Sequence, residues 1–123
     1  MTLQEIADAL ISHCRNGTED KGLNTLYADD VVSIEALAQP GGGPQMFEGL
    51  DALRGKHDYW NNAMEQVSIE AGGPYPHQPD KFALTFKGQA TVKETGEPFE
   101  MDEIAIYTVK DGKIAREEFF YSM

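Results

Sequence analysis

The last third of the chain contains two segments of alternating apolar and polar residues, joined by Asp111-Gly112. The segments read FEMDEIAIYTVK and KIAREEFFY, and together they cover Phe99–Tyr121. Side chains on a strand alternate between its two faces, and Asp-Gly is typical of a tight hairpin turn. The pattern therefore predicts an antiparallel hairpin. Acids and apolar residues occur on both of its faces, whereas a surface ribbon would keep them apart.

The register of this hairpin depends on the length of its turn. A two-residue turn, Asp111-Gly112, pairs Val109 with Ile114, whereas a three-residue turn that includes Lys110 pairs Val109 with Lys113. A shift of one residue exchanges the faces, and the spacing leaves both registers open. In the three-residue register one face holds Glu103, Tyr107, Glu117, Phe119 and Tyr121, and the other holds Ile104, Ile106, Ile114 and Phe120.

The second of these faces is apolar enough to require a cover. In a chain of 123 residues, helices can cover one face of the sheet, which leaves the other to a second subunit. We therefore expect a homodimer that forms through the outer sheet face, at Ile104, Ile106 and Phe120.

The first half of the chain has mainly helical periodicity. A first amphipathic helix, ending near Asn16-Gly17, is predicted by six residues at helical spacing: Leu3, Ile6, Ala7, Leu10, Ile11 and Cys14. Thr18 is the expected N-cap of a second helix that runs to about Ala28. A third helix begins at Gly49 and carries on one face Leu53, His57, Trp60 and Met64.

The remaining elements are strands and loops. The predicted strands outside the hairpin are Val31–Ala36, Val67–Ala71 and Phe82–Val92, the last with an irregularity at Gly88. Two stretches rich in Gly and Pro, Pro40–Pro44 and Gly72–Asp80, are expected to be loops. The order of elements predicts a single α+β domain over residues 1–123, with helices on one face of a curved sheet.

Charge and cysteine content limit the partners and the compartment. The chain has 10 Lys and Arg against 21 Asp and Glu, a net charge of −11, which disfavours nucleic acid and anionic membranes. No apolar run approaches the roughly 20 residues of a membrane span, and the first residues include acids where a signal peptide is basic. A single cysteine, Cys14, fits a cytoplasmic protein.

No motif for a metal or a cofactor is present in the sequence. Neither HExxH nor paired cysteines occur, and the three histidines show no ligand spacing. The run Gly41-Gly42-Gly43 lacks the Lys-Ser/Thr of a phosphate loop. We therefore expect no cofactor and no metal.

Three segments resemble the nuclear-transport-factor-2-like superfamily, in its SnoaL-like branch: LYADDVVSIEA (Leu26–Ala36), FEGLDALRG (Phe47–Gly55) and VKDGKI (Val109–Ile114). The resemblance implies a cone-shaped half-barrel, in which N-terminal helices pack in the concavity of a strongly curved, mainly antiparallel sheet. It also implies an apolar pocket at the wide end and frequent dimerisation through the outer sheet. Members include ketosteroid isomerases, polyketide cyclases, dehydratases, an epoxide hydrolase and binding proteins without chemistry.

The resemblance also assigns positions in the site. The position of the isomerase base holds Glu35, whereas the positions of the oxyanion-binding Tyr and Asp hold Leu10 and Ala105. The inward acid of the cyclases corresponds to Phe119, with Glu117 next along that face. Glu35 is therefore a candidate general base with a pKa raised by apolar walls, or else a surface acid at the end of a strand.

Glu103 and Glu117 are the other acid–base candidates. Two acids among aromatic residues are costly to bury unless they are protonated, paired or used in chemistry. They either share a site, where repulsion keeps one of them neutral as a proton donor, or lie at an open rim and pair with Arg54 or Lys56. His57 is a candidate proton shuttle or a core histidine. Expected walls of the pocket are Trp60, Tyr107, Phe82, Leu84, Phe86, Phe119 and Tyr121.

These residues favour a small-molecule pocket protein. The predicted chemistry is proton transfer without a cofactor, in an isomerisation, cyclisation or dehydration of an apolar carbonyl compound, with Glu35 as base and Glu103 or Glu117 as acid. The alternative is a ligand-binding or dimeric scaffold protein without catalysis. The sequence does not identify the substrate.

Overall fold

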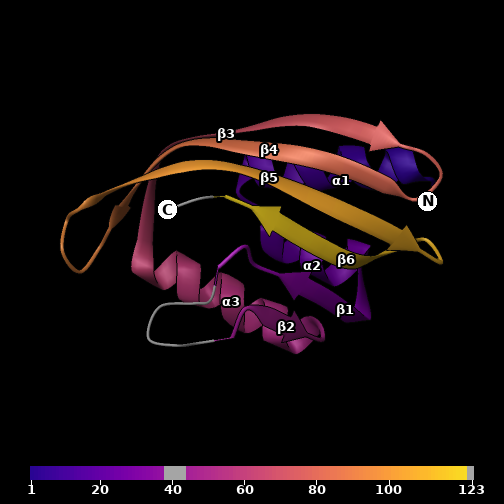
Figure 1. Cartoon of the computed structure of the whole chain (residues 1–123), viewed down its shortest axis with the longest axis horizontal. Helices are drawn as coiled ribbons and strands as arrows, with labels where there is room; N and C mark the ends of the chain where they lie inside the picture. The colour runs from indigo at the N-terminus through magenta and orange to yellow at the C-terminus, as the bar shows by residue number, and fades with distance from the viewer. Residues whose placement is uncertain (38–43, 122–123) are drawn as a thin grey trace.

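The computed structural model describes residues 1–37 and 44–121, and it is built around one six-stranded sheet (Figure 1). The strand order is β2-β1-β6-β5-β4-β3. The strands are β1 (Tyr27–Ile34), β2 (Met46–Glu48), β3 (Met64–His77), β4 (Lys81–Val92), β5 (Pro98–Lys110) and β6 (Lys113–Phe120). β1 and β6 run parallel, and every other neighbouring pair is antiparallel.

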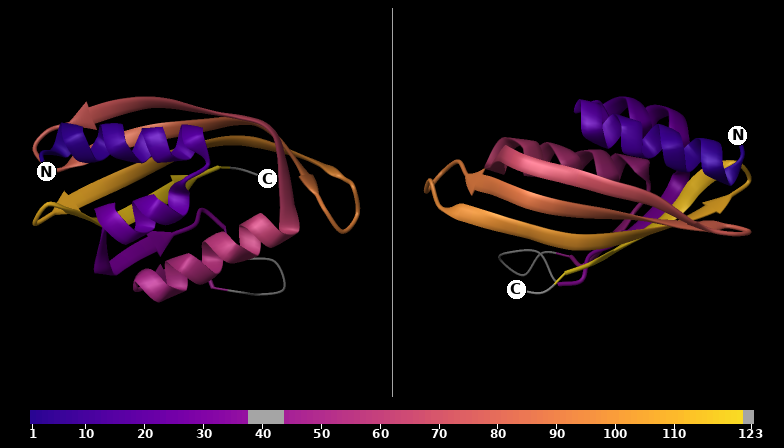
Figure 2. Two further views of the ribbon diagram at one scale, coloured as in Figure 1. Left: turned by 180° about the vertical axis from the view of Figure 1, so that it is seen from behind. Right: turned by 90° about the horizontal axis from the view of Figure 1, so that it is seen from above.

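Three helices pack against the concave side of this strongly curved sheet (Figure 2). They are α1 (Leu3–Asn16), α2 (Glu19–Leu26) and α3 (Leu50–Ala63). This arrangement confirms the predicted α+β fold. Among the described residues, no helix is both long and apolar enough to cross a membrane.

The ends of α1 follow from its sequence. The hydroxyl of Thr2 accepts a hydrogen bond from the backbone N–H of Glu5, and the carboxylate of Glu5 accepts one from the backbone of Thr2, which together form a capping box. Gly17 ends the helix with a left-handed φ of 69°, as predicted. Thr18 precedes α2, but its hydroxyl contacts His13 Nδ1 at 2.7 Å instead of capping the helix.

The core lies between the three helices and the sheet. Its fully buried side chains include Ile6, Leu53, Phe82, Leu84 and Ile114. Burial of each such side chain contributes about 1.5–3 kcal/mol to folding. The predicted stripe of α1 supplies one wall of this core, because Leu3, Ile6, Ala7, Leu10 and Ile11 are all buried.

The closing hairpin combines features of both predicted registers. Its turn has two residues, Asp111 and Gly112, both with positive φ, and Val109 pairs with Ile114. A bulge at Ala115 then shifts the register, so that Tyr107 pairs with Glu117 and Ile104 with Phe120. Glu103, Tyr107, Glu117, Phe119 and Tyr121 therefore share a face, as they would with a three-residue turn.

The bulge also corrects one expectation about the outer face. Ile114 precedes the bulge, so its side chain turns inward and is completely buried in the core, not exposed beside Ile104. Ile104 and Phe120 remain outside, and each is 48% exposed.

Several predicted boundaries differ from the structure. The expected loop Gly72–Asp80 belongs largely to β3, an edge strand that tolerates proline and absorbs a register shift between Gly72 and Tyr75. β1 begins at Tyr27, so the second helix is shorter than expected. The predicted irregularity near Gly88 is present, because Gly88 has a φ of 148° and lies next to the residues that face a register shift between Gln66 and Ser68 of β3. The predicted loop Pro40–Pro44 lies outside the described residues except for Pro44.

Candidate functional site

A cavity of about 840 Å³ opens between α3, the tips of the N-terminal helices and the inner face of the sheet. Its aromatic and apolar walls include Trp60, Phe86, Phe99, Met101, Phe119 and Tyr121. Trp60 of α3 meets Phe99 of β5 edge to face, with 6.0 Å between the ring centroids. Such a volume is typical of a small-molecule site.

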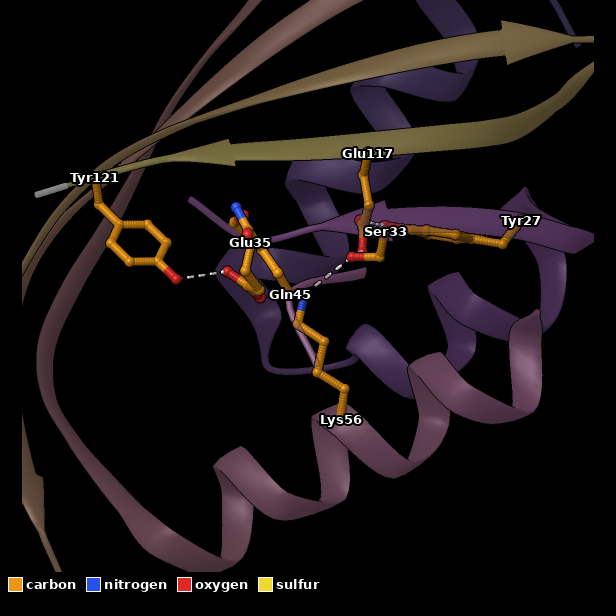
Figure 3. Close-up of polar contacts among 7 residues, drawn as sticks. All are labelled: Tyr27, Ser33, Glu35, Gln45, Lys56, Glu117 and Tyr121. Carbon is orange, nitrogen blue, oxygen red and sulfur yellow. Dashed lines mark hydrogen bonds and ion pairs between the residues drawn. The ribbon is translucent and has the colours of Figure 1, made fainter. Parts of the chain in front are cut away.

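Glu117 of β6 lies at the closed side of this cavity and is only 1% exposed. Its carboxylate accepts hydrogen bonds from the hydroxyls of Tyr27 and Ser33, each at 2.8 Å (Figure 3). Both donors come from β1, which pairs with β6. A buried carboxylate with a donor on each oxygen is satisfied by the protein, and Glu117 is therefore poorly placed to exchange a proton with a ligand.

Lys56 of α3 connects Glu117 to a second carboxylate. Its ammonium donates to Ser33 Oγ at 2.9 Å and forms an ion pair with Glu35 Oε1. The other oxygen of Glu35 accepts from the hydroxyl of Tyr121 at 3.0 Å (Figure 3). The result is one continuous polar chain from Tyr27 to Tyr121 across the cavity.

The backbone and the surrounding rings hold this chain in place. Glu35 follows directly after β1, and its backbone N–H and C=O contact Gln45 at 2.9 Å each. The ammonium of Lys56 lies 4.4 Å from the centroid of the Phe119 ring and 5.4 Å from that of Phe47. These aromatic faces stabilise a cation that is largely removed from water.

Glu103 of β5 faces the same cavity but is not part of the polar chain. Among the described residues its carboxyl group has no hydrogen-bond or ion-pair partner within contact distance. The pKa of Glu103 is raised to about 7: burial is the largest cause, the charges of Glu35 and Glu117 act in the same direction, and the charge of Lys56 opposes them. Glu103 therefore exchanges a proton near neutral pH.

Three tyrosines of the cavity, Tyr27, Tyr107 and Tyr121, stay protonated at neutral pH. Burial raises the pKa values of Tyr27 and Tyr107 well above the ordinary value, and the charge of Glu117 adds to the effect. Burial, followed by the charge of Glu35, raises the pKa of Tyr121 to about 12. These hydroxyls can act as neutral hydrogen-bond donors.

A family model for the SnoaL-like domain matches residues 1–121. The chain belongs to the SnoaL-like domain family. Among solved structures, a candidate SnoaL-like polyketide cyclase from Mesorhizobium loti is 39% identical and has a TM-score of 0.88, and the match covers 98% of this chain and 100% of that one. A candidate isomerase from Bacillus subtilis is 20% identical, with a TM-score of 0.76 over 96% of this chain and 84% of that one.

A third solved structure is a hypothetical protein from Catenulispora acidiphila with a ketosteroid isomerase-like fold, in complex with trimethylamine. It is 20% identical and has a TM-score of 0.73 over 100% of this chain and 88% of that one. No curated protein matches the chain. The SnoaL-like fold is therefore shown, whereas the activity has to be argued from the site.

Most of the side chains that the sequence indicates meet in the cavity of this SnoaL-like domain. The three candidate carboxylates, Glu35, Glu103 and Glu117, all line it, and so do His57, Trp60, Tyr107, Phe86, Phe119 and Tyr121. Glu35 is only 8% exposed, so it is not a surface acid. Arg54 pairs with Asp51, and Lys56 pairs with Glu35.

Phe82 and Leu84 are placed differently from the prediction. Both lie in the buried core and not on the cavity wall, because α1 packs over this part of β4. Phe82 instead lies beside the wall, since it is the cross-strand partner of Tyr107 and its ring stacks on that of Tyr107 with 4.9 Å between centroids.

Sequence reasoning did not assign three members of the polar chain to the cavity, although it named Lys56 as a possible ion-pair partner of Glu103 or Glu117 at an open rim. Lys56 lies one turn before Trp60 on the inward face of α3, and this spacing could have indicated it as a cavity residue. Ser33 precedes Glu35 by two positions on the same face of the strand, which is a weaker signal. Tyr27 falls within the predicted second helix, which is expected to run to about Ala28, whereas in the structure it begins β1 and its hydroxyl donates to Glu117.

Within residues 1–37 and 44–121, no three or more His, Cys, Asp or Glu side chains gather in a group that could hold a metal ion. Burial raises the pKa of the Cys14 thiol to about 12, and the charge of Glu19 acts in the same direction. Cys14 is thus a poor nucleophile at neutral pH.

Proposed function

We propose that this SnoaL-like protein catalyses proton transfer on a small, largely apolar carbonyl compound without a cofactor. The reaction class is an isomerisation, a cyclisation or a dehydration. The observation that supports this proposal is Glu103: a carboxyl group without a protein partner among the described residues, in an apolar cavity, with a pKa of about 7. A general base or acid works best when its pKa lies near the operating pH.

The proposed roles of the carboxylates differ from the roles that the sequence suggests. Each oxygen of Glu35 already has a partner, Lys56 on one and Tyr121 on the other, so Glu35 has fewer free lone pairs for a ligand proton than Glu103. Both oxygens of Glu117 are held in the same way. Glu103 is therefore the proposed proton acceptor and donor, while Glu35 and Glu117 are members of the polar chain whose charges add to the effect of burial on the pKa of Glu103.

The aromatic walls supply binding and exclude water. A ligand between Trp60, Phe99 and Phe119 buries apolar surface at about 25 cal/mol per Å². Exclusion of water also keeps the pKa of Glu103 high, because desolvation is its main cause. Binding and acid–base activation thus depend on the same apolar enclosure.

The experiment uses 5-nitrobenzisoxazole, an aromatic probe that a carboxylate opens by removing one carbon-bound proton. The expected rate rises with pH, with an inflection near 7, and levels off when Glu103 is ionised. Glu103→Gln should lower the rate by about 100-fold or more and remove the inflection. Glu100→Gln is the matched control, because this exposed acid lies on the opposite face of β5.

Equal rates in the wild type and Glu103→Gln would contradict the proposal. Binding of the probe without any turnover above that of free acetate would favour the alternative, a ligand-binding protein without catalysis.

The outer face of the sheet is proposed to hold a second copy of the chain. Ile104 and Phe120 are cross-strand partners there, each about half exposed, and Ile106 lies on the same face. Paired exposed apolar side chains of this kind are typical of an interface. The single cysteine supports a cytoplasmic location for this dimer.

A further inference from the structure

We propose that Lys56 is a second catalytic group of the cavity, and that its ammonium binds the ligand oxygen on which negative charge develops. The ligand would then be a weak oxygen acid: an enolisable ketone, or a phenol that resembles its enolate. The catalytic part of this inference rests on the proposed proton transfer, whereas the binding part can be tested without turnover.

The position of Lys56 supports this assignment. Its side chain extends from α3 into the cavity and is 16% exposed. An ammonium has three N–H donors. Among the described residues two acceptors contact it, Ser33 Oγ and Glu35 Oε1, and this leaves one donor for a ligand.

The ammonium is also preorganised. Ser33 donates its own proton to Glu117, so its lone pairs face Lys56, and Phe119 covers one side of the ammonium at 4.4 Å. A donor fixed in a site of low dielectric stabilises a developing oxyanion with little reorganisation. A flexible lysine on the surface would offer no such advantage.

The proposed proton transfer places negative charge on the ligand oxygen, in a cavity that already holds carboxylates, and a nearby cation would stabilise that charge. When a ligand C–H bond breaks, its proton goes to Glu103, its electron pair forms the new C=C bond, and the carbonyl π electrons move to oxygen. The negative charge thus leaves Glu103 and appears on the ligand, close to the carboxylates of Glu35 and Glu117. Among the described lining residues the lysines are Lys56 and Lys93, and Lys93 is exposed, with its ammonium on the carbonyl of Asn61 at 2.9 Å.

The reverse transfer completes the reaction without a further reactant. The proton on Glu103 returns to the same carbon or to a conjugated one, and the oxygen gives its charge back to the carbonyl. Lys56 keeps its proton throughout. It acts through a hydrogen bond and charge, while Glu103 carries the proton.

The test measures binding of 4-nitrophenol, whose ionised form absorbs at longer wavelength than its neutral form. The background is Glu103→Gln, because a neutral amide imitates the protonated acid and removes the competing base. In this variant, bound 4-nitrophenol should be ionised at a pH about 1–2 units lower than free 4-nitrophenol, which corresponds to about 10- to 100-fold tighter binding of the anion. Bound ligand that ionises at the same pH as free ligand would overturn the proposal.

The matched variants separate Lys56 from general effects. Adding Lys56→Met should abolish the spectral shift, Lys56→Arg should retain part of it, and Lys93→Met should leave it unchanged. Lys56→Met leaves Glu35 without its ion-pair partner, so the variant with both Glu35→Gln and Lys56→Met is measured as well. It should also lack the shift, and a normal shift in this variant would overturn the proposal.

The two proposals fail in different ways. A pH-dependent rate with 5-nitrobenzisoxazole but no shift of bound 4-nitrophenol would reject Lys56 and retain Glu103. A shift that depends on Lys56 but no turnover would reject the catalytic function and retain the assignment of the ligand class.

Discussion

Glu35 and Glu103 face the same cavity, and after burial the charge of Glu35 is the largest cause that raises the pKa of Glu103 to about 7. Lys56 opposes this effect while it forms the ion pair with Glu35. The three side chains come from three elements: the end of β1, α3 and β5. Beyond the effect of burial, the proton affinity of Glu103 therefore depends on two groups that hold each other in place.

Removal of either neighbour should move the pKa of Glu103 in a predictable direction. Glu35→Gln removes a negative charge, so the pKa of Glu103 should fall below 7, whereas Lys56→Met removes a positive charge and should raise it. The carboxyl carbon of Glu103, followed by ¹³C NMR against pH, reports both shifts. An unchanged titration in both variants would show that the three groups do not interact, and Glu100→Gln is the control that should not alter it.

Glu103 should also destabilise the fold at high pH. Its pKa is about 7 in the folded chain and near 4.5 when exposed, so the folded state binds more protons between these values and stability falls as pH rises through them. The cost is absent below pH 4.5 and complete above pH 7, where it is at most about 3 kcal/mol. Glu103→Gln should thus be more stable than the wild type at pH 8 and equally stable at pH 4.

Urea denaturation at the two pH values measures this difference. An equal gain in stability at pH 4 and pH 8 would assign it to packing and not to ionisation.

The sequence predicts those parts of the site that depend on local periodicity. The spacing of Leu3 to Ile11 determines α1, and the alternation of β5 places Glu103 and Tyr107 on one face. The face of Glu117 depends on the bulge at Ala115, which neither spacing nor composition reveals. Register in a hairpin is set partly by packing against the core, and burial of Ile114 is part of that packing.

The partners of the carboxylates could not be predicted because they come from distant elements. A single lysine on a helix, such as Lys56, usually extends into solvent, and only the packing of α3 beside β1 turns it toward Glu35. Tyr27 and Ser33 satisfy Glu117 across the parallel pair of β1 and β6, which separates them from Glu117 by more than 80 residues of sequence. These long-range contacts pair Glu35 and Glu117 with protein groups. Among the described residues, they leave the carboxyl group of Glu103 free to contact a ligand.

The hydrogen bond from Tyr27 to Glu117 should be important for stability. Tyr27→Phe removes one donor and leaves an oxygen of a buried carboxylate unsatisfied, which costs about 1–3 kcal/mol. The free energy of unfolding in urea measures the loss. Tyr59→Phe is the control, since Tyr59 is 60% exposed and should change stability by less than about 0.5 kcal/mol. Equal effects of the two substitutions would contradict the assigned role of Tyr27.

The exposed apolar residues on the outer face of the sheet should be needed for the proposed dimer. Phe120→Asp places a carboxylate opposite Ile104, at the centre of the proposed dimer interface, where an unpaired charge would be desolvated. Sedimentation at micromolar concentration should show a dimer for the wild type and a dissociation constant raised by at least about tenfold for Phe120→Asp. Tyr75→Asp is the matched control, because Tyr75 is a similarly exposed aromatic residue, 57%, on the edge strand β3. A wild type that is monomeric throughout, or a Phe120→Asp variant that dimerises normally, would exclude this face as the interface.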